Sequence, residues 1–201
     1  MSSISNRSTQ PVSHKITVTA LLSAIAFILQ YIEVPIPLMP AFIKFDFSDL
    51  PALLAAFSLG PVYGVATELI KNLVHLPASS SAMIGELSNF ILGAAFVFTA
   101  GLIYKKDKTR KGAIIASITG SVVMAVVCLP VNYYLIYPLY GSVLNFSTDA
   151  IVSMYQVILP SVKDLWQCLL IFNFPFTLVK GLIDVLITFL IYKKLSPILH
   201  K

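Results

Sequence analysis

Charged residues are scarce in this chain, and their scarcity excludes the usual soluble classes. Of its 201 residues, 11% are Asp, Glu, Lys or Arg and 57% are hydrophobic. Soluble domains have roughly 25% charged and about 45–50% apolar residues. A disordered chain is also excluded, because such chains contain few apolar residues. The composition therefore predicts a polytopic membrane protein with little mass outside the bilayer.

Cysteines and catalytic motifs are also few. Two cysteines, Cys128 and Cys168, exclude a disulfide scaffold, and their positions in apolar runs indicate packing thiols. The chain has no G-x-x-x-x-G-K-[ST] phosphate loop and so no ATPase of its own. It also lacks the H-E-x-x-H, G-x-S-x-G, C-x-x-C and G-x-G-x-x-G motifs. His14, His75 and His200 are dispersed, which predicts no metal site.

Basic residues, in contrast, gather at the ends of apolar runs. The net charge is +5, and the clusters are Arg7 with Lys15, residues 105–111, and Lys193 with Lys194. Lys and Arg beside membrane segments mark the cytoplasmic side. A nucleic-acid surface would instead spread them over a soluble face with aromatics between them, so no nucleic-acid partner is expected.

Six apolar segments alternate with these clusters. Both termini and all three clusters fall in the cytoplasm if every segment crosses the bilayer. The predicted fold is therefore all-α, with one six-helix domain over residues 16–195 between cytoplasmic tails at 1–15 and 196–201. The second segment is short, since a span needs about 20 residues. The segments cover residues 16–34, 49–59, 61–76, 83–104, 112–137 and 168–192.

Prolines divide the segments and shape the connections. Three prolines in residues 35–48 prevent a helix there and predict an apolar, aromatic loop on the outer side. Pro130 predicts a kink in the fifth segment. Residues 138–167 form a long outer connection, with a short amphipathic helix expected at 150–159 and capped by Thr148 or Asp149.

Polar side chains inside apolar segments are costly and mark candidate functional sites. Glu68 and Lys71 are three residues apart, so a pair between them is the favoured interpretation. Lys180 and Asp184 are one turn apart, and a neutralising pair or a ligand contact explains them equally well. Glu86 begins the fourth helix, where a carboxylate complements the helix N-terminus.

Depth in the membrane favours a binding site open to one side. The outer half or midplane holds polar groups from several helices, whereas the inner half has no equivalent set. A channel would carry polar groups along its whole length. Apolar walls with a few placed polar groups are typical of a ligand pocket. The outer residues are Lys71, His75, Glu86, Asn89, Asn132, Thr177 and Lys180, beneath the loop at 38–47.

Small residues on the first helix suggest a contact with another helix. Ala20 and Ala24 are four residues apart, with Ser23 and Ala26 nearby. Such spacing allows close approach of a second helix, either within this molecule or from a partner.

Several stretches resemble the substrate-binding S components of energy-coupling-factor (ECF) transporters, and most of all the riboflavin-specific members. The resemblance implies six helices, an outward site for riboflavin as transported ligand, and no enzymatic activity or resident cofactor. It also implies an energising module of two ATPase subunits and a transmembrane coupling subunit as partners. The stretches are KFDFSDLPAL within residues 40–76, GELSNFILGAAF, LPVNYYLIYPLYG and PFTLVKGLIDVLITFLIYKKL.

The resemblance also implies roles for individual residues. Ala20 and Ala24 match the coupling motif A-x-x-x-A of the first helix. Thr177 stands where the family pattern P-F-N-x-x-K-G has Asn, and Asn173 lies one turn earlier. Ligand contacts are implied at Leu38, Met39, Ala41, Phe42, Asn132 and Lys180. Neighbouring polar and aromatic side chains complete the candidate set, namely Glu86, Asn89, Tyr133, Asn173 and Thr177.

Three alternatives remain open at this point. The same fold could bind another vitamin, in which case the outer-half residues would differ in role. A small intramembrane enzyme could use Glu68, Lys71 and His75 as acid–base groups. A secondary transporter working as a dimer would need coupling-ion sites and no ATPase.

Overall fold

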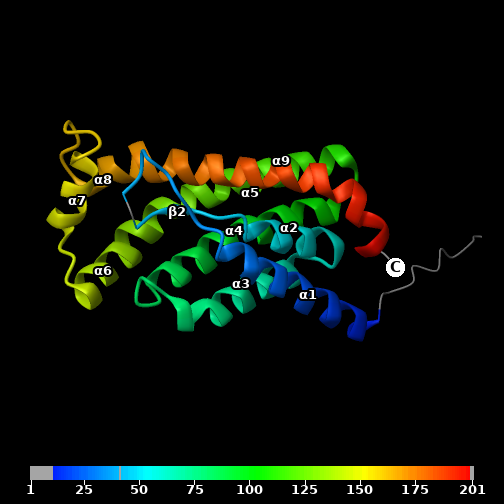
Figure 1. Cartoon of the computed structure of the whole chain (residues 1–201). Coiled ribbons are helices and arrows are strands. Elements are labelled where there is room, and N and C mark those ends of the chain that lie inside the picture. Colours follow the sequence, from blue (N-terminus) through cyan, green and yellow to red (C-terminus); the bar gives the residue numbers. More distant parts are fainter. Residues whose placement is uncertain (1–10, 41, 200–201) are drawn as a thin grey trace, which may run out of the picture.

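The chain folds into a bundle of helices that lie side by side along one direction (Figure 1). The computed structural model describes residues 11–40 and 42–199, with side chains to residue 190. Two short strands, β1 (Val34–Pro35) and β2 (Lys44–Phe45), lie in one loop. The helices are α1 (Val12–Gln30), α2 (Asp49–Ser58), α3 (Pro61–His75), α4 (Ile84–Lys106), α5 (Arg110–Val131), α6 (Tyr137–Leu144), α7 (Thr148–Gln156), α8 (Leu165–Cys168) and α9 (Phe174–Leu199).

Within the described part of the chain, four segments are long and apolar enough to cross a bilayer. They are Val12–Gln30, Ile84–Lys106, Arg110–Leu144 and Leu165–Leu190. The predicted all-α membrane fold is therefore confirmed in outline. The other two predicted spans are α2 and α3, of 10 and 15 residues, and both are shorter than a typical span of about 20.

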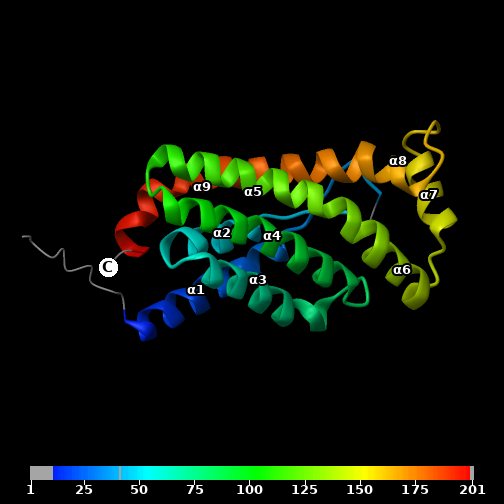
Figure 2. The same ribbon diagram turned by 180° about the vertical axis from the view of Figure 1, so that it is seen from behind.

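The short helices α2 and α3 form an antiparallel pair, and their ends lie within one residue of those predicted. Gly60 makes the reversal with a φ of 118°, a conformation that favours glycine. Pro61 then begins α3, where its missing N–H is not needed. The start of α1, the end of α9 and the α2–α3 and α4–α5 turns lie at the same end of the bundle (Figures 1 and 2).

The ends of the first helix differ from the prediction. α1 begins at Val12, directly after Pro11, rather than at residue 16. It ends at Gln30 rather than at residue 34, because residues before a proline disfavour helical angles and Pro35 follows. The last helix continues to Leu199, beyond the expected end at residue 192.

The predicted outer loop contains the two strands as a small antiparallel hairpin. Val34 lies opposite Phe45, and Pro35 opposite Lys44. An ion pair between Glu33 and Lys44 lies beside this hairpin. The hairpin leads the chain directly to the start of α2.

Two π-helical turns interrupt the long helices, and a proline follows each of them. Asn132–Ile136 precedes Pro138, and Leu169–Asn173 precedes Pro175. A proline has no N–H for the carbonyl four residues earlier, so hydrogen bonding shifts locally to the wider π spacing. The fifth helix thus continues to Leu144 rather than ending at residue 137. The interruption expected at Pro130 lies instead in the first π turn, which begins two residues later at Asn132.

The outer connection holds α7, which begins at Thr148 and ends at Gln156, earlier than predicted. Its N-cap is Ser147, whose Oγ accepts a hydrogen bond from the amide of Ala150 at 3.2 Å. Tyr155 of α7 is fully buried in an apolar cluster at this end of the bundle.

Candidate ligand-binding site

A cavity lies among the first loop, α4, the α5–α6 segment and α9. The empty space within it, counted out to its open mouth, is about 770 Å³. Its lining includes aromatic and aliphatic side chains, namely Phe42, Leu92, Ile136, Tyr137, Tyr140 and Phe176. It also includes polar or ionisable groups, namely Asp46, Asp49, Ser88, Asn89, Cys128, Asn132, Asn173, Thr177 and Lys180.

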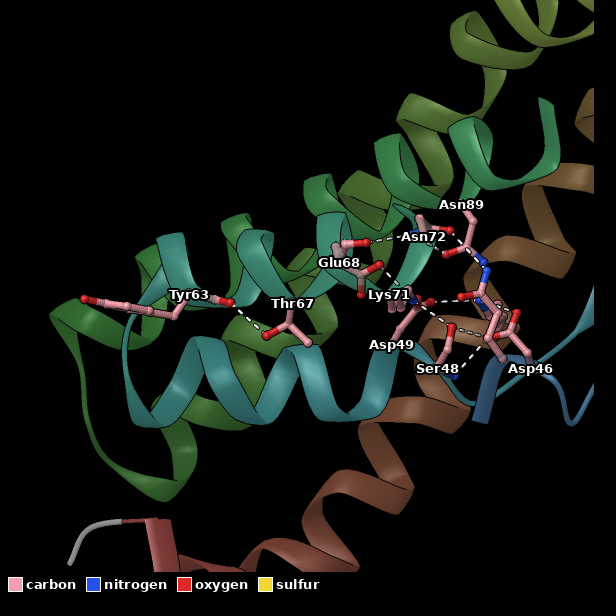
Figure 3. Close-up of polar contacts among 11 residues, drawn as sticks. Asp46, Ser48, Asp49, Tyr63, Thr67, Glu68, Lys71, Asn72 and Asn89 are labelled. Carbon is pink, nitrogen blue, oxygen red and sulfur yellow. Dashed lines mark hydrogen bonds and ion pairs between the residues drawn. The ribbon is translucent and has the colours of Figure 1, made fainter. Parts of the chain in front are cut away.

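Asp49 binds both Lys71 and Lys180, and Figure 3 shows it beside Lys71. Its Oδ1 is 2.6 Å from the Nζ of Lys71, and its Oδ2 is 2.8 Å from the Nζ of Lys180. Asp46 Oδ2 lies 3.4 Å from the same Lys180 ammonium. The neutralising pair of Lys180 with Asp184, one of two equally favoured interpretations, does not form among the described side chains, because the lysine reaches across to the start of α2 instead.

The predicted pair of Glu68 and Lys71 is confirmed. Glu68 Oε2 lies 2.8 Å from the Lys71 ammonium, and both side chains are fully buried. Lys71 also donates to the hydroxyl of Ser48 at 2.6 Å. Gly93 of α4 makes room for this pair, since a Cβ there would lie 2.5 Å from Glu68 Oε2. Charges buried this deeply require such partners.

Asn89 and Asn132 face the cavity with hydrogen-bonding capacity left over. Asn132 Nδ2 donates to Cys128 Sγ at 3.1 Å, and its carbonyl oxygen has no partner among the described residues. The carbonyl oxygen of Asn89 accepts from Asn72 at 3.4 Å, which leaves its amide donors unused in the described part of the chain. Thr177 donates to the same Cys128 at 3.4 Å. These groups can bind the donors and acceptors of a neutral ligand.

Asn173 is held in a triangle with two tyrosines. Its Oδ1 accepts from the Tyr155 hydroxyl at 2.6 Å, and its Nδ2 donates to the Tyr137 hydroxyl at 2.8 Å. The two hydroxyls are 2.6 Å apart. Burial raises the pKa of Tyr155, so its phenol stays protonated and remains a donor. The triangle fixes the amide at the edge of the cavity.

The candidate residues of the first loop differ in whether they line the cavity, are buried or are exposed. Phe42 lines the cavity. Met39 is buried in the apolar cluster at the outer end, whereas Leu38 is 70% exposed. Ala41 lies outside the described residues. The loop therefore contributes one aromatic wall and packing contacts.

Two further candidates lie away from the cavity. Tyr133 is on the outer face of the π turn, because Asn132 before it is turned inward. The ring centroid of Tyr133 lies 5.7 Å from that of Trp166. Glu86 pairs with His75 Nδ1 at 2.8 Å and accepts from Ser79 at 2.7 Å. Glu86 is thus satisfied in the first turn of α4, as the helix N-terminus interpretation predicts.

The sequence reasoning missed several lining residues. Asp49 is one of them, although the two acids in the motif KFDFSD were a usable signal. Cys128 and Tyr137 were treated as packing residues or left unassigned. Both line the cavity because of their positions on the helix: Cys128 lies one turn before Asn132, and Tyr137 lies directly after the π turn.

Ala20 and Ala24 lie on the exposed side of α1, while Ser23 and Ala26 are buried in the bundle. Packing within the molecule therefore does not explain the two alanines. Leu21 and Ile28, also exposed, extend this apolar strip along the helix. The strip is open to a partner or to lipid.

The chain matches the family described as "ECF transporter, substrate-specific component" over residues 14–192. It is 35% identical to the riboflavin transporter RibU of Staphylococcus aureus (strain TCH60), over 90% of each chain. It is 30% identical to the riboflavin transporter FmnP of Bacillus subtilis (strain 168), over 91% of this chain and 92% of that one.

A solved structure, titled "Structure and mechanism of the S component of a bacterial ECF transporter", agrees with the fold. It superposes with a TM-score of 0.73 at 33% identity, covering 94% of this chain and 99% of that one. This chain belongs to the substrate-specific components of ECF transporters, and it is a multi-pass plasma-membrane transport protein rather than an enzyme.

Proposed function

We propose that this chain binds riboflavin in the cavity and mediates its uptake together with an ECF energising module. The observation that carries the proposal is a cavity with aromatic walls and unused amide groups in a chain whose relatives are named riboflavin transporters. Riboflavin is neutral, flat and aromatic, with a polar edge and a hydroxylated tail. Such a ligand needs apolar walls and a few neutral hydrogen-bonding groups.

Each part of the ligand has a suitable counterpart. The rings of Phe42, Tyr137 and Phe176 supply flat apolar surface for the ring system. Asn89 and Asn132 supply the unused donors and acceptors for its polar edge. The ammonium of Lys180 has three N–H groups, of which Asp49 and Asp46 occupy two. The third N–H is left for a ring carbonyl or a tail hydroxyl.

The aspartates that hold Lys180 also suit a neutral substrate. The cavity wall carries Asp46 and Asp49 beside Lys180, and its second lysine, Lys44, pairs with Glu33, so it offers no surplus positive charge. This arrangement keeps the lysine oriented without requiring an anion. Leu38, Met39 and Ala41 remain candidates for contact if the first loop moves on binding, whereas Glu86 and Tyr133 lie outside the cavity wall.

The proposed topology has six crossings with both termini in the cytoplasm. The common end of α1 and α9, and the basic residues at 105–111 beside it, support this orientation. The exposed Ala20 and Ala24 then form the contact for the coupling subunit, since small residues permit close helix approach. The module comprises this subunit and two ATPases.

Uptake in cells that depend on external riboflavin tests the proposal. We expect growth on low riboflavin when this chain is expressed with the energising module. Growth that persists after deletion of both ATPase subunits would favour a secondary transporter instead. Failure to grow on riboflavin, with rescue on thiamine or biotin for a matching auxotroph, would move the substrate to another vitamin.

A further inference from the structure

A second cavity lies at the opposite end of the bundle from the ligand-binding site. The empty space within it, counted out to its open mouth, is about 670 Å³, and it is formed by the α2–α3 turn and the C-terminal part of α4. Figure 2 shows this turn at the same end as the α4–α5 connection. No residue lines both this cavity and the riboflavin cavity, so the two are distinct.

The recess exists because the α2–α3 pair is shorter than its neighbours. Pro61, the first residue of α3, rests against Gly101 of α4, where a Cβ would be 2.9 Å from the proline. Lys105 lies one turn further along α4, about 6 Å beyond this contact. Lys105 near the end of α4 and Lys108 in the following turn thus line the space beside the α2–α3 turn.

The cavity wall combines apolar, phenolic and cationic groups. Phe57 and Tyr104 pack together, with ring centroids 4.6 Å apart. Leu59 and Pro61 continue the apolar side. Tyr63 lies on the other side, and the Lys15 ammonium is 5.6 Å from the centre of its ring. A wall of this kind fits a ligand that is apolar at one end and anionic at the other.

The cations of the wall are not neutralised by the protein. Lys105 and Lys108 are exposed, and neither forms an ion pair with a carboxylate among the described side chains. Residues 105–111 contain five basic residues and one acid, Asp107. The oxygen Oδ1 of Asp107 accepts from the backbone amide of Thr109 at 3.1 Å. The cavity mouth is thus strongly positive.

We propose that this cavity binds the headgroup of an anionic glycerophospholipid, with Lys105 and Lys108 on the phosphate. Basic pockets between membrane helices on the cytoplasmic side are suited to such headgroups. The apolar side, with Phe57 and Leu59, lies along the start of the acyl chains. This apolar contact distinguishes a lipid from a free phosphate, which would use only the cationic groups.

Native mass spectrometry of the full-length protein in mild detergent tests the site. The probes are dioctanoyl phosphatidylglycerol, dioctanoyl phosphatidylcholine and inorganic phosphate. The test variant is Lys105→Gln with Lys108→Gln, and the control is Lys106→Gln with Lys111→Gln, which removes equal charge outside the cavity wall. Both double variants should bind riboflavin like the unaltered chain.

We expect one tightly bound phosphatidylglycerol, with about thirty-fold weaker binding in the test variant and little change in the control. Phosphatidylcholine should bind weakly to all three proteins. Equal weakening by both double variants would show a diffuse attraction and overturn the site. Displacement of the lipid by millimolar inorganic phosphate would assign the lysines to a soluble anion and overturn the lipid proposal.

Discussion

Replacing Asp49 by Asn removes a carboxylate that both buried lysines share. The substitution keeps the shape of the side chain and removes its charge, so the two ion pairs at 2.6 and 2.8 Å are lost together. Lys71 retains Glu68 at 2.8 Å, and Lys180 retains Asp46 at 3.4 Å. Neither lysine is left wholly without a partner.

The magnitude follows from burial. Removing one partner of a buried ion pair costs about 3–5 kcal/mol, and the retained partners place Asp49→Asn near the lower value, about 3 kcal/mol. For a chain of this size, each kcal/mol lowers the melting temperature by about 2–4 °C. The expected shift for Asp49→Asn is therefore roughly 6–12 °C.

Thermal unfolding in detergent, followed by the fluorescence of Trp166, measures this shift. Asp149→Asn is the matched control. It makes the same chemical change at a residue that is exposed on α7 and lies outside the network. Its melting temperature should change by less than about 2 °C. Equal melting temperatures for the two variants would refute the reasoning that Asp49 holds the network together.

Three further substitutions probe the packing, the tyrosine triangle and the exposed strip. Gly93→Ala forces a methyl group onto Glu68 and should destabilise the fold by about 1–3 kcal/mol in chemical denaturation. Tyr155→Phe leaves Asn173 Oδ1 without its donor and should lower the free energy of unfolding by about 1–3 kcal/mol. Ala24→Leu should leave riboflavin binding unchanged and abolish uptake with the energising module, because it prevents close helix approach.

Each of these has a control within the chain. Gly141→Ala meets only ordinary contact at 3.4 Å and should be nearly neutral. Tyr134→Phe removes a hydroxyl from a side chain that is 76% exposed and should also be nearly neutral. For Ala24→Leu, riboflavin titration of the same purified variant separates coupling from binding. Destabilisation of the controls by as much as the test variants would contradict the assigned contacts.

Local signals in the sequence were sufficient for much of the helical framework. The α2–α3 pair was located within one residue because Gly60 and Pro61 mark its turn. The apolar runs and basic clusters likewise predicted the long helices. The π turns were not predicted, because their cause is a proline assigned to the outer loop, Pro138, or to the inside of the last apolar segment, Pro175.

The site was predictable only in part. Asn89, Asn132, Thr177 and Lys180 were identified from polarity at membrane depth, and they line one cavity. The partner of Lys180 was not identified, because Asp49 is 131 residues away in the sequence. Pairing between residues one helical turn apart favours Asp184 instead. Contacts between distant segments depend on packing that periodicity does not encode.

The central claim is that riboflavin occupies this cavity. The most direct measurement is a titration of purified protein with riboflavin, following the quenching of riboflavin fluorescence, for Asn132→Ala beside Tyr133→Ala. These neighbours differ in that Asn132 lines the cavity and Tyr133 faces outward. The account predicts one-to-one quenching that thiamine and biotin do not relieve, and about ten-fold or greater weakening only for Asn132→Ala. Absence of quenching at micromolar protein, or weakening by Tyr133→Ala alone, would contradict it.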